Sequence, residues 1–282
     1  MSIGVYIPIP AYYVDPAFMA RRAEELGFES IWCAEHPIMP VHTTSRFPGN
    51  ESGEIPEVYA HFVDPFIALA RASGATTSIK LGTSITLITE RNPLLMAKEV
   101  STLDVFSKGR FIFGIGTGWL REETQLMGGD FDHRWTQARD SIAALKELWT
   151  QDEAEYHGRY YDFPPVKVYP KPVQKPHPPI MLGGMAPNVL KRVVSWADGW
   201  MPNRVTATRI EEARREIEAL AGEMGRDPAS INISVFGQQA DPALVQGFLD
   251  SGADRVIISP PTHTTDEAMG EELERIANLL LK

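Results

Sequence analysis

The stretch Leu81–Glu123, which reads LGTSITLITERNPLLMAKEVSTLDVFSKGRFIFGIGTGWLREE, predicts a strand, a helix and a second strand in succession. The strands are expected at Leu81–Ile88 and Phe111–Ile115. Between them, Asn92-Pro93 combines an N-cap side chain with a proline at the first helical position, which is typical of a helix start. The apolar positions that follow recur at helical spacing and form one face: Leu95, Met96, Val100, Leu103 and Phe106.

The same strand-then-helix order runs along the whole chain. Most strand candidates are continuously apolar, as expected where a parallel sheet is covered on both faces. Eight such units favour an α/β fold, a closed (β/α)8 barrel of the TIM type, over an open sheet. The strand count by itself leaves an open eight-stranded sheet as the alternative. The further strand candidates are Ile3–Ile9, Ser30–Glu35, Ile180–Leu182, Gly199–Met201, Ile231–Phe236 and Arg255–Ser259.

The chain of 282 residues is predicted to form one domain, residues 1–282, because barrels of about 250 residues fold as single units. Insertion loops are expected at the C-terminal face of the strands. Residues 37–62 are rich in proline and glycine and follow the second strand, so they form a candidate lid over the active-site face. Phe163 to Pro179 contains too many prolines for a helix or a central strand and is interpreted as a surface connection.

The composition argues against several classes of function. A formal net charge of −10 disfavours broad binding to nucleic acid or to anionic membranes. The N-terminus lacks a signal-peptide pattern and no apolar run reaches the length of a membrane span, so a cytoplasmic protein is expected. The single cysteine, Cys33, fits a reducing compartment. The histidines other than His36 show no metal-ligand spacing: His42, His61, His133, His157, His177 and His263.

Glu35-His36 closes the second predicted strand, and catalytic groups of barrels gather at such strand ends. Histidine can transfer protons near neutral pH, and the adjacent carboxylate can accept a hydrogen bond. His36 is therefore the candidate catalytic residue. Its position alone is explained equally well by a structural histidine.

Two glycine-containing turns are candidate cofactor sites. The run from Gly114 to Gly118 fails the dinucleotide pattern G-x-G-x-x-G because Trp119 stands where the third glycine belongs. It indicates close approach of the backbone to a flat ligand or to neighbouring strands. Gly183-Gly184 follows a short strand, and Pro187 is predicted to start a helix, so exposed amides would converge on a phosphate. Arg204 is a candidate bidentate partner for that phosphate, although a flexible strand-to-helix turn explains the glycine pair equally well.

Together, these segments resemble the bacterial luciferase-like oxidoreductase family over nearly the whole chain. The most specific stretch is Leu81–Glu123, with G-T in the third strand, R-x-P at the next helix start, S-x-G-R before the fourth strand and G-x-G-W-x-x-E after it. EHP at Glu35–Pro37, LGG at Leu182–Gly184 and SWADGWM at Ser195–Met201 also fit. The loop Phe47–Phe66 is similar to an actinobacterial branch labelled F420-dependent. The resemblance implies a (β/α)8 barrel with a deazaflavin or flavin at the C-terminal ends of the strands.

The resemblance also implies roles for single residues. His36 matches the residue near the reactive ring that aids proton transfer, and Glu35 matches an acidic position beside the hydroxyl end of the deazaflavin. Ser84-Ile85 matches a non-proline cis peptide that backs the ring. Trp119 stands where sugar-phosphate dehydrogenases of the family have an acidic glutamate, which argues against glucose-6-phosphate and suits a flat or apolar substrate. The residues expected to border the ring or to hold the phosphate are Thr86, Leu87, Gly183, Gly184 and Met185.

The leading hypothesis is an F420-dependent oxidoreductase that transfers a hydride between the deazaflavin and an unidentified small organic substrate. The alternative is an FMN-dependent monooxygenase that receives reduced flavin from a partner reductase and activates oxygen. A third class, a cofactor-binding protein without catalysis, is disfavoured because Glu35-His36 is intact. No metal, nucleic acid or membrane is expected as a partner. A homodimer fits the family's habit of pairing barrels through their helices.

Overall fold

A computed structural model describes residues 2–282 of the chain. Its parallel strands follow one another in the order β3-β2-β1-β11-β10-β9-β8-β5-β4, and β3 also pairs with β5, which closes the ring. The closure confirms the (β/α)8 barrel and excludes the open sheet. The barrel strands are β1 (Ile3–Tyr6), β2 (Ser30–Cys33), β3 (Lys80–Thr83), β4 (Thr86–Leu87), β5 (Phe111–Gly116), β8 (Ile180–Gly183), β9 (Gly199–Met201), β10 (Asn232–Gln238) and β11 (Arg255–Ile258).

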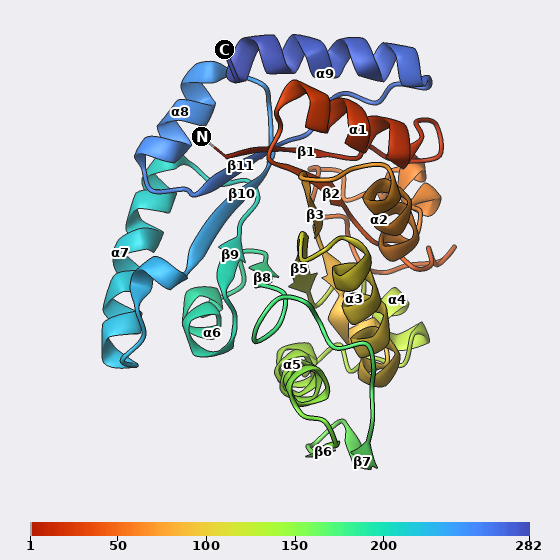
Figure 1. Ribbon diagram of the computed structural model, residues 1–282, viewed down its shortest axis with the longest axis vertical. Helices are drawn as coiled ribbons and strands as arrows, with labels where there is room; N and C mark the ends of the chain where they lie inside the picture. The colour runs from red at the N-terminus through yellow and green to blue at the C-terminus, as the bar shows by residue number, and fades with distance from the viewer. Residues whose placement is uncertain (1) are drawn as a thin grey trace.

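Helices surround the barrel, with α9 lying across α1 at one end of the view (Figure 1). They are α1 (Pro16–Leu26), α2 (Pro65–Gly74), α3 (Pro93–Phe106), α4 (Arg121–Leu126), α5 (Arg134–Thr150), α6 (Val189–Trp196), α7 (Ala207–Glu223), α8 (Pro242–Asp250) and α9 (Asp266–Leu280), with short 3-10 helices η1 (Glu57–His61), η2 (Ile88–Glu90) and η3 (Pro228–Ser230). None of the helices within residues 2–282 combines the length and the apolar character needed to cross a membrane.

Helix starts follow the predicted caps. The side chains of Asp15, Asp64, Asn92 and Asp241 each accept a backbone N–H in the first turn, next to a proline. The prediction for α6 was wrong by two residues: the helix begins at Val189, not at Pro187. Asn188 has a φ of 61°, which is left-handed backbone and cannot belong to a right-handed helix.

The third strand differs from its prediction. One strand is expected over Leu81–Ile88, whereas β3 and β4 are separate and a cis peptide bond joins Ser84 to Ile85 between them. The cis bond stands at the position that the family resemblance implied. β2 also ends sooner than predicted, at Cys33, so Glu35 and His36 lie in the loop that follows it.

The proline-rich segment contributes no strand to the barrel, although the side chain of Gln174 donates to the carbonyl oxygen of Phe111 in β5. Its start forms β7 (Asp162–Val166), which pairs with β6 (Ala154–His157) in an antiparallel hairpin beyond α5 (Figure 1). Residues 167–179 then run irregularly to β8, as predicted for a surface connection. The hairpin itself was not predicted. Because β6 and β7 form their own sheet, the prolines remove no hydrogen bond from the barrel.

Alternate strand residues pack on opposite sides of the barrel wall. Ile31 belongs to the large cluster shared with the helices, whereas Trp32 belongs to a separate cluster of strand residues. A Cβ added to Gly4 would lie 2.8 Å from the Trp32 indole, and a Cβ added to Gly82 would lie 2.2 Å from it. Both positions therefore require glycine, because a side chain there would overlap the indole.

Candidate active site

A cavity of about 400 Å³ opens at the C-terminal ends of the strands. Its walls come from the segment after β2, the β5–α4 loop, the start of α5 and the β8–α6 loop. Thr86 is fully buried and, like Arg204, does not line it. The other predicted site residues do line it: Glu35, His36, Ser84, Ile85, Leu87, Gly183, Gly184 and Met185.

His36 is held by Glu123, which lies in the first turn of α4. Nδ1 of His36 is 2.6 Å from Oε2 of Glu123, and the backbone N–H of Ile38 donates to Oε1 at 3.4 Å. The His36 side chain is 6% exposed and that of Glu123 is fully buried. In the tautomer in which Nδ1 donates its proton to Glu123, the lone pair of Nε2 is left for a group in the cavity.

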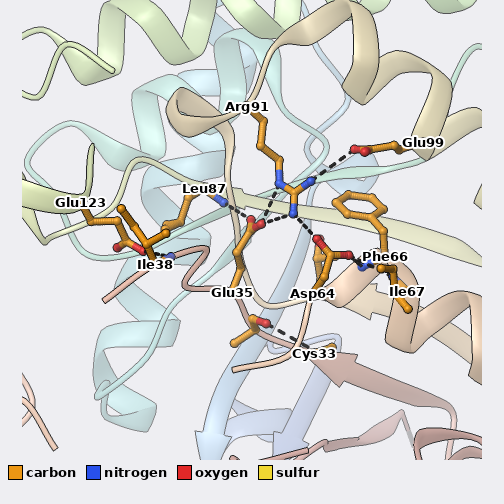
Figure 2. Close-up of polar contacts among 12 residues, drawn as sticks. Cys33, Glu35, Ile38, Asp64, Phe66, Ile67, Leu87, Arg91, Glu99 and Glu123 are labelled. Carbon is orange, nitrogen blue, oxygen red and sulfur yellow. Dashed lines mark hydrogen bonds and ion pairs between the residues drawn. The ribbon is translucent and has the colours of Figure 1, made fainter. Parts of the chain in front are cut away.

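Both carboxylate oxygens of Glu35 accept hydrogen bonds from other residues of the protein (Figure 2). Its Oε2 accepts the backbone N–H of Leu87 at 2.8 Å, and its Oε1 accepts Nε of Arg91 at 2.6 Å. Arg91 also donates to Asp64 at 2.6 Å and to Glu99 at 3.3 Å. Burial raises the pKa of Glu35, and the charge and hydrogen bonds of Arg91 oppose that rise. Because both oxygens have partners, Glu35 fixes Leu87 at the cavity wall, and its contact with a cofactor stays a prediction.

One wall of the cavity is built around Ile85. A Cβ added to Gly116 would lie 1.8 Å from the Ile85 side chain, and a Cβ added to Gly183 would lie 2.7 Å from it. A Cβ on Gly114 would meet the carbonyl oxygen of Thr83 at 1.8 Å. These glycines therefore make room for a neighbouring strand and its side chain, which is the second of the two explanations that their spacing left open.

The insertion 37–62 covers one side of the cavity, where the sequence predicts a lid. The His36 ring centroid lies 5.4 Å from that of Tyr59 and 5.2 Å from that of Phe62. Trp119, from the β5–α4 loop, lies 5.8 Å from His36. These rings give the space around His36 an aromatic wall. Movement of the insertion stays a prediction.

Arg204 contacts the insertion, and its predicted contact with a phosphate stays a prediction. Its guanidinium donates to the carbonyl oxygen of Pro48, which lines the cavity. Within residues 2–282, no hydrogen bond joins Arg204 to the Gly183-Gly184 turn. The β9–α7 loop is thereby tied to the insertion.

Two polar side chains of the cavity have unused hydrogen-bonding atoms. Arg134, the first residue of α5, lines the cavity together with Gly183 and Gly184. Among the residues that the structure describes, its Nε has no partner, and neither has Oγ of Ser84. Buried polar groups normally find partners, so the unused atoms fit the polar groups of a bound cofactor.

A protonated carboxyl lies near the His36–Glu123 pair. Glu90 is 4% exposed and accepts the hydroxyl of Thr124 at 2.8 Å. Burial and the negative charge of Glu123 raise the pKa of Glu90 to about 8. Glu90 therefore keeps its proton at neutral pH in the folded protein.

Sequence reasoning missed three residues of this site, Glu123, Arg91 and Arg134. Arg91 stands in the R-x-P pattern, whereas Glu123 directly follows the last residue of G-x-G-W-x-x-E, which is Glu122; neither pattern assigned a role to Glu123 or Arg91. Arg134 has no local signal. It becomes a site residue because α5 begins where the β8–α6 loop also meets the cavity.

The family model of luciferase-like monooxygenases matches residues 14–240 of the chain. This protein belongs to that family. Among its luciferase-like relatives, an uncharacterized protein of Mycobacterium tuberculosis is 33% identical over 94% of this chain and 93% of its own. The F420-dependent glucose-6-phosphate dehydrogenase of Amycolatopsis mediterranei is 31% identical over 64% of this chain and 51% of its own. The FMNH2-dependent dimethylsulfone monooxygenase of Pseudomonas putida is 31% identical over 56% of this chain and 48% of its own.

Solved structures share the fold of this luciferase-like chain. A monooxygenase of Streptomyces bottropensis superposes with a TM-score of 0.79 at 18% identity, over 100% of this chain and 99% of that one. The coenzyme F420 dependent tetrahydromethanopterin reductase of Methanopyrus kandleri superposes with a TM-score of 0.76 at 19% identity, over 99% and 98%. At such identities the likeness establishes the shared barrel.

Proposed function

We propose that this luciferase-like protein is an oxidoreductase that uses F420 and acts on a small organic molecule. The observation that carries the proposal is His36, whose Nδ1 is held by the buried Glu123 while Nε2 is left for the cavity. When bound, F420 supplies or takes up a hydride at C5 of its deazaflavin ring. Hydride transfer at a carbon that bears oxygen requires a proton at that oxygen, and His36 is the group that handles this proton.

The cavity offers a partner for each part of such a cofactor. We assign Ile85 and Leu87 to the ring and the amides of Gly183–Met185 to the phosphate. We assign the cation at that phosphate to Arg134 in place of Arg204, because Arg134 lines the cavity together with this turn. Oγ of Ser84 is available for one further hydrogen bond.

Glu123 prepares His36 for proton transfer. It keeps the tautomer with the proton on Nδ1 and stabilises the imidazolium that forms when Nε2 takes up a proton. In the opposite direction, the imidazolium returns that proton to the substrate oxygen. Tyr59, Phe62 and Trp119 surround His36 and keep water from it, consistent with its 6% side-chain exposure.

A second candidate function is an FMN-dependent monooxygenase served by a partner reductase. The FMNH2-dependent relative, as similar in sequence as the F420-dependent one, favours it. The phosphate of FMN suits the same turn and the same arginine, so this end of the cavity serves either cofactor. A protein that binds the cofactor without catalysis would not need the His36–Glu123 pair, so the pair argues against that class of function.

Titration of the apo-protein with F420 and with FMN, followed by quenching of tryptophan fluorescence, tests the choice of cofactor. We expect micromolar binding of F420 and at least about tenfold weaker binding of FMN. Micromolar binding of FMN without binding of F420 would overturn the proposal.

Substitution of His36 tests the catalytic assignment. His36→Ala should retain cofactor affinity and lose turnover. As a control, His42→Ala, at an exposed histidine of the insertion 37–62, should retain both. Unchanged turnover in His36→Ala would show that the assignment is wrong. A homodimer and a cytoplasmic location belong to the same proposal, and light scattering and cell fractionation test them.

A further inference from the structure

A second hollow lies beside the active-site cavity and is lined mainly by residues of α5 and α6. It has a volume of about 390 Å³ and shares Trp135 with the cavity. Its lining includes Arg139, Lys191 and Arg192, and no acidic residue of the described chain lines it. Three cations without a carboxylate are unexpected on a protein whose formal net charge is −10.

The positive charges that line this hollow are not balanced by carboxylates among its lining residues. Arg192 stacks on the ring of Trp135 at 4.5 Å and donates to the carbonyl oxygen of Pro187 at 2.5 Å, so it uses neutral partners. Burial and the positive charge of Arg134 lower the pKa of Arg192, because the two guanidinium groups are neighbours. Arg139 is exposed and available to a ligand. The hollow is therefore built to receive negative charge.

The hollow continues the phosphate end of the cavity. Arg134 and Trp135 are adjacent at the start of α5; both line the cavity, and Trp135 also lines the hollow. Asn188 and Arg192 line the hollow just beyond the Gly183–Met185 turn in the chain. A ligand chain that leaves this turn on the side of Trp135 enters the hollow.

We infer that the hollow between α5 and α6 binds an oligoanionic tail that extends from the cofactor phosphate, with Arg139, Lys191 and Arg192 as its cationic contacts. The inference rests on the proposed function, because F420 continues beyond its phosphate into a chain of glutamates whose carboxylates have this chemistry. FMN ends at its phosphate and does not reach the hollow. The hollow thus makes the affinity for a deazaflavin depend on its tail.

The test compares deazaflavin phosphates without glutamates and with a short or a long glutamate tail. Their equilibrium binding to the full chain is followed by the polarisation of deazaflavin fluorescence. We expect the affinity at low salt to rise about tenfold from the tail-less form to the long-tailed form. High salt should remove most of this gain, since the contacts are between exposed charges.

The variant Arg139→Glu/Lys191→Glu should abolish the gain and leave the affinity for the tail-less form unchanged. Both positions are exposed, and thermal unfolding checks that the variant is folded. Arg139→Gln/Lys191→Gln repeats the test by removing the two charges without reversing them. This variant should lose part of the affinity gained from the glutamate tail. Arg21→Glu/Lys282→Glu is the matched control, because it changes the net charge equally at exposed positions on α1 and after α9.

Equal affinities for tailed and tail-less forms, or a gain that survives both Arg139/Lys191 variants, would overturn the inference and leave the F420 proposal intact. Binding of FMN with no binding of any deazaflavin phosphate would overturn the proposed function, and the inference with it.

Discussion

Nδ1 of His36 lies 2.6 Å from Oε2 of Glu123, a residue 87 positions later in the chain. The loop after β2 carries the histidine, and α4, which follows β5, carries the carboxylate. Since the Glu123 side chain is fully buried, we propose that it acts on the reaction through His36 and does not touch the substrate. In this proposal Glu123 is a positioning residue.

Glu123→Gln retains the size of the side chain and removes its charge. We expect turnover to fall by roughly 100-fold, because the His36 imidazolium loses its stabilising partner, while cofactor affinity is unchanged. The pH profile of kcat/KM should also move. Steady-state kinetics of this variant, of His36→Ala and of the double variant check the coupling: the double variant should be no slower than His36→Ala. Losses that multiply would show that the two residues act independently.

Because of Glu90, the free energy of unfolding should fall as the pH rises. Its pKa is about 8 in the folded protein, against about 4.3 for glutamate in an unfolded chain. The folded state therefore holds the proton more tightly, and the free energy of unfolding decreases between about pH 4.3 and about pH 8. Glu90→Gln cannot titrate, so near pH 8 it should be more stable than the wild type, by on the order of a few kcal/mol. Urea unfolding at both ends of this pH range measures the difference, and a difference that is independent of pH would contradict the assignment.

Arg91→Met should leave Glu35 as a buried carboxylate without its ion pair. Glu35 is 4% exposed, so we expect the free energy of unfolding to fall by about 3–5 kcal/mol. Arg91→Met/Glu35→Gln should recover much of this loss, because the uncompensated charge is gone. Urea unfolding measures both variants. Arg22→Met is the control, since Arg22 makes exposed ion pairs and should lose less than about 1 kcal/mol. An equal loss in the two single variants would count against the buried pair.

Gly116→Ala should disturb the wall that Ile85 forms. The new Cβ would lie 1.8 Å from Cδ1 of Ile85, so that side chain must move, at a cost of about 1–3 kcal/mol in stability and with weaker cofactor binding. Ile85→Ala in the same chain should restore part of the stability. Thermal unfolding and cofactor titration are the measurements. At Gly222, in α7, a Cβ meets nothing within 4 Å, so Gly222→Ala should be neutral or stabilising. Similar effects at the two glycines would refute the packing argument.

Local patterns in the sequence determined the order of the elements and the family. Asp15, Asp64 and Asn92 mark helix starts correctly because a cap acts within one turn. Continuously apolar strands predicted a covered parallel sheet for the same reason: the pattern and its cause lie in the same few residues. The Leu81–Glu123 motifs predicted the luciferase-like family, which the family comparison confirms.

Tertiary structure decided which side chains meet in the cavity. Glu123 joins His36, Arg91 takes the carboxylate of Glu35, and Arg134 reaches the cavity while Arg204 binds the insertion. Each of these contacts joins segments that follow different strands. They depend on how the barrel closes and on which rotamers then fit, and neither is encoded in the propensity of any single segment.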